Sequence, residues 1–201
     1  MAFISLFEEC KRTLGKRAQA FVDIFDYLDS IQNPSIIEVG PFQGELKQST
    51  GTETRLFDCY AEDRGGKHLA VSPYYDICEV TKKNTVGTYV YNEHSVEFLA
   101  QLCGKIDCLY LNQYLTTSPS STYLASLHLQ ELFAAKDLLQ EGTLIIVEDH
   151  LSDKGWFEIT KPTDLVDELM FAIGIKPFID GSAGTMAWIY KELPQVKDVL
   201  D

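Results

Sequence analysis

Five short apolar runs, each followed by a segment with helical spacing, constrain the fold of this chain more than any other feature of its sequence. The runs cover residues 35–39, 68–71, 88–91, 107–111 and 144–147. Strands this short and this uniformly apolar are typical of parallel sheets, because helices cover both faces of such a sheet. The alternation therefore predicts a doubly wound α/β fold with a mostly parallel sheet.

The segments around these runs complete the predicted architecture. Helices are expected at 54–62, 76–83, 95–102, 122–139 and 163–173. Apolar residues recur at near-helical spacing through the first 30 residues, and Asn33-Pro34 ends that pattern. Two strand-like runs, 175–179 and 186–190, are joined by a Gly-rich stretch and predict an antiparallel hairpin. We expect one domain with an N-terminal helical cap (1–33), a body (34–191) and a tail (192–201).

Composition excludes several classes of partner. The chain has 17 Lys and Arg against 30 Asp and Glu, a net charge of −13 that repels phosphate backbones and anionic lipids. No apolar run approaches the roughly 18 residues of a membrane helix. Five cysteines without a CxxC spacing indicate free, buried thiols in a reducing compartment. We therefore expect a soluble, cytoplasmic protein that binds neither nucleic acid nor membranes.

Ligands of an open parallel sheet bind beyond the carboxyl ends of its strands, so the residues that follow each run are candidates. Glu38-Val39-Gly40 ends the first run, and a glycine there lets a ligand approach the backbone closely. A plain connecting loop explains the glycine equally well. GxGxxG and Walker sequences are absent. Ser72 ends the second run, where nucleotide ligands usually meet an acid, and the nearest acid is Asp76.

The remaining strand ends are more polar. Asn92-Glu93-His94-Ser95 follows the third run, where Ser95 could simply cap a helix while Glu93 and His94 face water. Asn112 follows the fourth run, and Glu148-Asp149-His150 follows the fifth. Adjacent strand ends could bring Asn112, Asp149 and His150 to one hard cation, Mg²⁺ or Ca²⁺, or to one substrate hydroxyl. A polar run where the chain emerges into water is the competing interpretation.

Two further histidines lie in predicted elements of the sheet and its helices. His128, in the predicted helix 122–139, could face the same pocket, although a lone helical histidine is more often packed or solvated. His68 stands at the start of a strand, which places it at the opposite edge of the sheet.

Five segments together carry a resemblance. They are Ile36-Ile-Glu-Val-Gly40, Gly51-Thr-Glu-Thr-Arg-Leu-Phe-Asp58, Ser95-Val-Glu-Phe98, Ile106-Asp-Cys-Leu-Tyr-Leu-Asn112 and Gly142-Thr-Leu-Ile-Ile-Val-Glu-Asp149. Their order and spacing resemble class I S-adenosylmethionine-dependent methyltransferases, in particular small metal-assisted O-methyltransferases, over residues 34–191. The resemblance implies a Rossmann-like sheet, and the terminal hairpin fits the antiparallel last strand of that family.

The resemblance also implies roles for individual residues. The methionine part of the cofactor would be held by Glu38 and Gly40 with the turn of Gly51, Thr52 and Thr54. Ser72 falls where the family has its ribose-binding acid, and His94 and Ser95 fall where it contacts adenine. Asn112 falls where metal-dependent members place an Asp ligand, Asp149 matches a second Asp ligand, and His150 stands where an Asn ligand is usual. The neutral Ser72 and Asn112 depart from the pattern and would weaken cofactor and metal binding.

The implied reaction is transfer of a methyl group from S-adenosylmethionine to a hydroxyl of a small molecule. Asp149 would bind a weakly held divalent ion, His150 would bind metal or act as general base, and Asn112 would orient the substrate. The main alternative is a catalytically degenerate methyltransferase-like fold that serves as a binding or assembly module. An α/β enzyme with another nucleotide is disfavoured because no phosphate-binding loop is present. The apolar face of the N-terminal helices offers a surface on which a second copy could form a homodimer.

Overall fold

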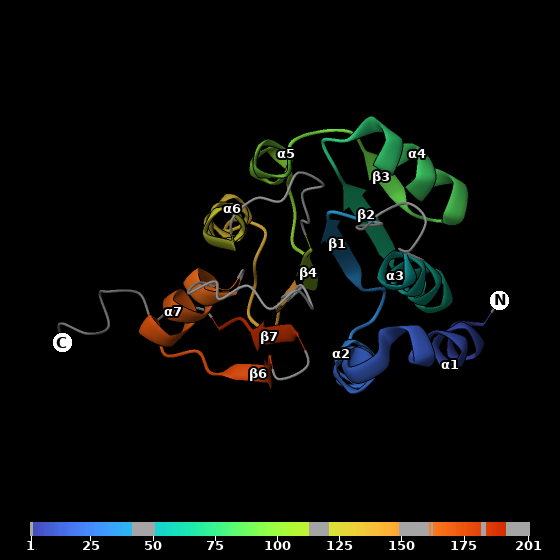
Figure 1. The fold of residues 1–201 in the computed structure, drawn as a ribbon, viewed down its shortest axis with the longest axis horizontal. Coiled ribbons are helices and arrows are strands. Elements are labelled where there is room, and N and C mark those ends of the chain that lie inside the picture. Colours follow the sequence, from blue (N-terminus) through green and yellow to red (C-terminus); the bar gives the residue numbers. More distant parts are fainter. Residues whose placement is uncertain are drawn as a thin grey trace.

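The computed structural model describes residues 2–41, 51–112, 121–148, 161, 163–181 and 184–191. Within these residues no helix has the length and apolar character needed to cross a membrane. The chain alternates helices and strands in the order that the sequence predicts (Figure 1). All five cysteines are free thiols; Cys103 is exposed rather than buried, because it lies in the connection after a helix.

The described residues form one seven-stranded sheet with the order β3-β2-β1-β4-β5-β7-β6. Strands β1 to β5 are parallel, and β7 is antiparallel to both of its neighbours. The strands are β1 Ser35–Val39, β2 Lys67–Val71, β3 Tyr89–Tyr91, β4 Cys108–Leu111, β5 Leu144–Glu148, β6 Pro177–Asp180 and β7 Thr185–Ile189. The first five agree with the predicted runs to within one residue at each end.

Strand order reverses between β1 and β4, which is where an open parallel sheet opens a crevice for ligands. The chain leaves β1 toward β2 on one side, whereas β4 leads to β5 on the other. The doubly wound α/β prediction is therefore confirmed, and the switch point lies beyond Val39 and Leu111.

Helices cover both faces of the sheet (Figure 1). One face packs against α1 (Phe3–Leu14), α2 (Ala18–Leu28) and α3 (Thr52–Arg64). The other packs against α5 (Ser95–Gln101), α6 (Ser121–Ala134) and α7 (Asp164–Ala172). The remaining helices are α4 (Tyr75–Asn84) and the short 3-10 turn η1 (Gly15–Arg17). Alternate residues of the central strands enter alternate clusters, Ile36 one and Ile37 the other, as a two-sided core requires.

The largest difference from the predicted bounds is in α6. Helix α6 ends at Ala134 rather than 139, because the chain turns tightly there: the amide of Leu138 donates to the carbonyl of Ala135. Leu138 and Leu139 are buried in that turn, so apolar residues that extend the helical pattern instead close the end of the helix. The predicted antiparallel hairpin is confirmed, and its second strand lies between β5 and β6.

The N-terminal helices belong to the core of the chain's own sheet. Phe3, Phe21, Phe25 and Leu28 share one cluster with residues of β1, β4 and β5. The phenolic hydroxyl of Tyr27 also donates to the carbonyl of Gly142, 2.7 Å away. The apolar face that could have paired with a second copy thus packs on the chain's own sheet, and a homodimer through these helices stays a prediction.

Replacing Phe21, which has no exposed surface, by Ala tests this arrangement. The substitution should cost about 3–5 kcal/mol of unfolding free energy, because it leaves a cavity beneath the sheet. Phe171 in α7 is 84% exposed, and its replacement by Ala should cost less than about 0.5 kcal/mol. Urea unfolding of both variants measures the difference. Equal, small effects would mean that the N-terminal helices do not pack on the sheet.

Candidate functional site

Gly40 and Asn112 meet at the switch point between β1 and β4. The amide of Asn112 donates to the carbonyl of Val39 (3.0 Å), and the amide of Gly40 donates to the carbonyl of Val71 (3.0 Å). Gly40 has φ +76°, a conformation that side chains strongly disfavour, so the glycine is required by the backbone itself. The structure therefore brings together two of the predicted site residues from distant parts of the chain.

Glu38 is completely buried at the end of β1. Its Oε1 accepts a hydrogen bond from the Thr54 hydroxyl (2.9 Å), so the predicted turn at the start of α3 does contact this acid. Its Oε2 lies 3.2 Å from Nε2 of His68. Burial raises the pKa of the Glu38 carboxyl, while the histidine and the threonine hydroxyl lower it in part.

His68 stands near the start of β2, as the sequence predicts, but its side chain contacts Glu38 of the predicted site. Its backbone is paired with Ile36 near the start of β1, but its ring extends along the sheet toward Glu38. Strand ends alone did not reveal this contact, because it spans two residues of register and uses the full length of both side chains. A buried histidine in an apolar strand was the signal that could have found it.

The start of α3 is set by Gly51, which is the N-cap residue with φ +53°. The helix begins at Thr52, two residues earlier than predicted, and the amide of Arg55 donates to the carbonyl of Gly51. Thr52 and Thr54 are buried in this first turn. Their placement leaves Thr54 against Glu38, at the end of the central strand.

Ser72 is fully buried where β2 ends. Its hydroxyl accepts from the amide of Tyr74 (3.3 Å), and its carbonyl accepts from the Asn92 side chain (3.1 Å). These bonds tie the ends of β2 and β3 together. Asp76 is exposed in the first turn of α4, and a contact between Ser72 and a ribose stays a prediction.

The N-terminus of α5 differs from the expected cap. The N-cap residue is His94, which like Glu93 is exposed, and Ser95 is the first helical residue. The hydroxyl of Ser95 donates to Glu131 in α6 instead of capping its own helix. No side-chain hydrogen bond caps this end of the helix.

Glu131 also contacts His128, whose Nδ1 lies 3.0 Å from the second carboxylate oxygen. Ser95, His128 and Glu131 are all nearly completely buried between α5 and α6. His128 is therefore packed between helices, which is a common environment for a lone helical histidine. Polar residues on an otherwise apolar helix face were the signal for this cluster.

Glu148 forms a second buried acid site at the end of β5. Nη1 of Arg17 donates to its Oε2 (3.1 Å), and the Thr185 hydroxyl donates to its Oε1 (2.9 Å). Arg17 also bonds the carboxylate of Glu53 in α3. An arginine from the N-terminal segment thus crosses to the carboxyl edge of the sheet, which no local sequence pattern indicates.

This environment raises the pKa of Glu148 to about 7. Burial is the largest cause, Arg17 opposes it, and the nearby Glu53 adds to it. Burial likewise raises the pKa of Tyr110, a β4 residue whose hydroxyl has no hydrogen-bond partner among the described residues. Two acids and a phenol therefore face one arginine beneath the switch point.

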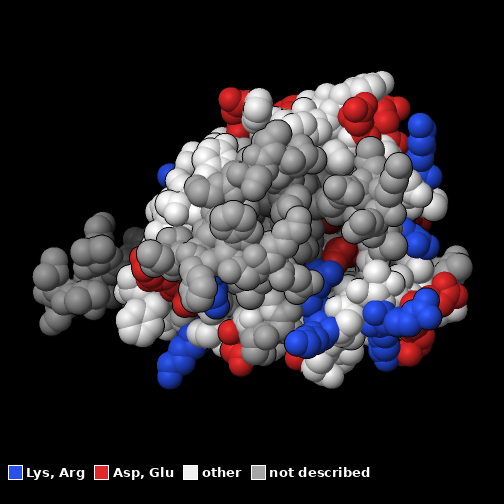
Figure 2. Space-filling view, viewed as in Figure 1, with Lys and Arg blue, Asp and Glu red and all other residues white. Residues whose placement is uncertain are grey.

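Asp149, His150 and the segments 42–50 and 113–120 lie outside the described residues, so the predicted roles of Asp149 and His150 stay predictions. Among the described residues, no three His, Cys, Asp or Glu side chains are grouped to hold a metal ion. Figure 2 shows basic side chains gathered over the N-terminal helices, with acidic ones between them.

No protein-family model and no curated protein sequence matches the chain. The fold does match solved structures of methyltransferases. The S-adenosylhomocysteine-bound methyltransferase PaMTH1 of Podospora anserina is 12% identical with a TM-score of 0.60, covering 94% of this chain and 88% of that one.

Two further structures agree. Magnesium protoporphyrin IX methyltransferase of Synechocystis, with bound S-adenosylmethionine, is 10% identical with a TM-score of 0.56, covering 92% of this chain and 84% of that one. The mycinamycin-pathway methyltransferase MycE, in complex with Mg and S-adenosylhomocysteine, is 13% identical with a TM-score of 0.60, covering 95% of this chain and 56% of that one. The chain therefore has the class I S-adenosylmethionine-dependent methyltransferase fold.

The raised pKa of Glu148 predicts a pH-dependent stability. Between pH 4.5, the ordinary value, and about 7, the folded chain keeps a proton on Glu148 that the unfolded chain has lost. The unfolding free energy should therefore fall as pH rises through this window, by up to about 3 kcal/mol from this group.

Urea unfolding between pH 5 and 8 measures this effect. Glu148→Gln should flatten the pH slope, whereas Glu8→Gln, which changes an exposed carboxylate on α1, should leave the slope as it is. An unaltered slope in Glu148→Gln would show that the carboxylate is not desolvated.

Proposed function

We propose that this protein transfers a methyl group from S-adenosylmethionine to a hydroxyl of a small molecule. The observation that carries the proposal is the meeting of Gly40, Glu38 and Asn112 at the switch point of a methyltransferase fold. Ligands of such sheets bind there. The sequence contains neither a GxGxxG nor a Walker motif, which disfavours a nucleoside triphosphate as the ligand.

The residues present fit the proposed cofactor. Gly40 has no side chain and exposes its backbone to close approach, and Glu38 supplies a buried acid for a cationic group beside it. At the far end of the same edge, the exposed Asn92, Glu93 and His94 provide hydrogen-bonding groups for a base and a ribose. The proposal therefore places the cofactor along the ends of β1, β2 and β3.

When bound, S-adenosylmethionine supplies a sulfonium whose methyl group is already reactive. The protein's own residues then have to align the acceptor and remove its proton. Asn112, buried at the end of β4, is suited to orient a hydroxyl through its amide. We propose His150 as the base, because an imidazole with an ordinary pKa of about 6.5 accepts a proton near neutral pH.

We also propose that any divalent-ion dependence is weak. Asn112 stands where a charged ligand would be needed, and hard cations are held mainly by ligand charge and number. Glu148, an acid next to Asp149 in sequence, is already paired with Arg17 and Thr185 and is not available as a further ligand.

The cofactor proposal is tested by titration calorimetry with S-adenosylhomocysteine. Wild-type protein should bind, and Gly40→Leu should lose binding because the side chain blocks the backbone at the end of β1. Gly174→Leu is a matched control: Gly174 has φ +78°, nearly that of Gly40, and a Cβ there would meet no atom within 4 Å. The two variants carry similar backbone strain, so only the site differs.

Binding that persists in Gly40→Leu would move the cofactor away from Gly40. Absence of heat from wild-type protein at millimolar ligand would favour the binding-module alternative, which the neutral Ser72 and Asn112 leave open.

The metal proposal is tested by assaying methyl transfer after exhaustive chelation. Activity should fall by less than about tenfold, and added Mg²⁺ should restore the loss only when Asp149 is present, not in Asp149→Asn. Full activity after chelation would remove the metal from the mechanism and leave His150 as the base. A tightly retained ion would contradict the weak-binding proposal.

A further inference from the structure

We propose that His68 is a positioning residue that shares one proton with Glu38 and thereby keeps this acid ionised and correctly aimed for the cofactor. The inference rests on the proposed function, since it concerns the acid at the cofactor end of β1. The proposal adds His68, from the opposite end of the neighbouring strand β2, together with Thr88 and Asp58, which hold the histidine ring in place.

The pair is isolated from water and from other partners. Glu38 is 0% and His68 is 1% exposed. Oε2 of Glu38 and Nε2 of His68 lie 3.2 Å apart, and neither atom has a hydrogen-bond partner elsewhere in the described chain. The His68 ring also lies against Phe57 of α3, with ring centroids 5.9 Å apart. The two polar atoms can therefore satisfy only each other.

The contacts of the other ring nitrogen, Nδ1, show that it carries a proton. Nδ1 of His68 lies 2.9 Å from the Thr88 hydroxyl, and that hydroxyl donates to Oδ1 of Asp58 (2.7 Å). A threonine hydroxyl has a single hydrogen, so its oxygen can only accept from His68. Nδ1 therefore carries a proton, and Nε2 remains to be assigned.

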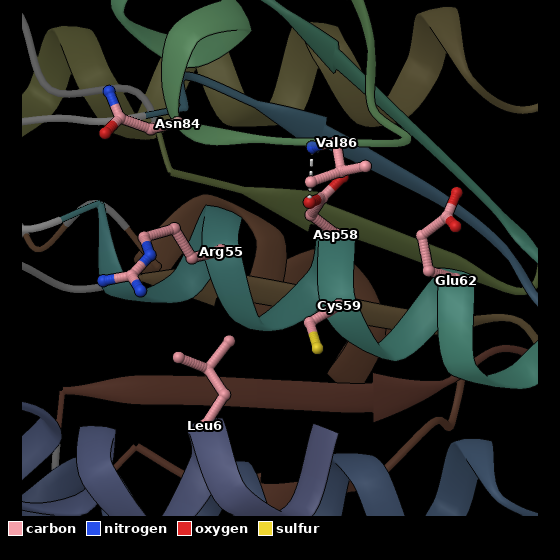
Figure 3. A pocket seen from close by; sticks show the side chains of 7 residues that line it. All are labelled: Leu6, Arg55, Asp58, Cys59, Glu62, Asn84 and Val86. Atoms are coloured by element: carbon pink, nitrogen blue, oxygen red, sulfur yellow. Dashed lines mark hydrogen bonds between the residues drawn. The ribbon is translucent and has the colours of Figure 1, made fainter. Parts of the chain in front are cut away.

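Asp58 anchors this chain of contacts at its far end. Besides Thr88, its carboxylate accepts the backbone amides of Val86 (2.8 Å) and Gly87 (3.0 Å). Figure 3 shows Asp58 directed from α3 toward Val86. Both residues line a pocket with a volume of about 260 Å³. Three donors suit an acceptor-only carboxylate, so Asp58 has no proton to return to Thr88.

One proton must then lie between Nε2 and Oε2, because two lone pairs would otherwise face each other in the core. Whether it is bonded to nitrogen or oxygen, the pair has no net charge, which is what a water-free site favours. Glu38 and His68 would hold a cationic group of the cofactor best with the shared proton on Nε2, because the carboxylate beside that group is then ionised. The Thr54 hydroxyl holds the other oxygen, so the carboxylate cannot rotate.

The remaining titratable groups facing Glu38 do not supply this proton. Glu53 of α3 and the β4 residues Tyr110 and Cys108 are the other groups that interact with it. Glu53 is bonded to Arg17, and burial raises the pKa of Tyr110 and Cys108, which keeps both neutral. His68 is therefore the group whose protonation matches the charge of Glu38.

The test is the pH profile of S-adenosylhomocysteine affinity, measured by calorimetry between pH 6.5 and 8.5. In His68→Gln the amide keeps a hydrogen-bond donor but cannot become a cation, so the pKa of Glu38 should rise further. Affinity in this variant should be about tenfold weaker at pH 6.5 than at pH 8.5, the change expected for about one pKa unit. The wild-type change across the same range should be about twofold or less.

Glu38→Gln provides the matched background. In that background, adding His68→Gln should produce no further pH dependence, because no carboxyl remains to titrate. Equal weakening at every pH in His68→Gln, or the same pH dependence in the Glu38→Gln background, would overturn the proposal and leave His68 a packing residue.

Two measurements keep the proposal testable if His68→Gln does not fold or if wild-type protein binds no cofactor. Thr88→Val leaves the histidine in place but removes the acceptor of Nδ1, and should shift the profile in the same direction by a smaller factor. Nitrogen NMR of histidine-labelled wild-type protein should show Nδ1 of His68 protonated, and Glu38→Gln should change the protonation of Nε2. Absence of cofactor binding with this NMR signature would reject the proposed function and retain the proton sharing; an unprotonated Nδ1 would reject the proton sharing.

Discussion

The burial of acidic side chains at the carboxyl edge of the sheet is the constraint on which the rest of this structure depends. Glu38 and Glu148 end two strands that are covered by helices, and a desolvated carboxylate must be paired or protonated. The structure uses a different partner for each: His68 with Thr54 for Glu38, and Arg17 with Thr185 for Glu148. His68 reaches this edge from the start of β2 and Arg17 from the N-terminal segment, so these contacts connect the site to distant elements of the fold.

These contacts explain why the N-terminal helices and the start of α3 are integral to the site. Arg17 bonds both Glu148 and Glu53, and therefore links the N-terminal segment, α3 and β5 in one polar cluster. On the other face of the sheet, Glu131 links α5 and α6 through Ser95 and His128. Both faces of the sheet thus carry buried acidic networks. A buried polar network lowers the stability of the fold when one of its groups lacks a partner. These networks therefore favour a single arrangement of the surrounding helices.

Much of the candidate site could be predicted from strand ends, because a parallel sheet gathers the carboxyl ends of its strands at one edge. Gly40 and Asn112 were identified in this way, and the structure places them across one strand pairing. Ser95 was expected to cap its own helix, but a carboxylate on the neighbouring helix binds its hydroxyl instead. The backbone of His68 stands at the start of β2, which excluded it from the predicted site, yet its side chain is long enough to reach Glu38.

The sequence by itself determined the positions of the strands, the mostly parallel character of the sheet and the terminal hairpin, since these depend on local periodicity and on turn residues that act over a few positions. The order of the strands in the sheet came only from the tertiary structure. The tertiary structure decided which side chains meet. Arg17 and Glu148 are 131 residues apart, and His68 and Glu38 lie on different strands. Pairs of this kind form only after the core has closed and removed water from the carboxylates. No local pattern encodes them, because the burial that makes each partner necessary arises from the whole fold.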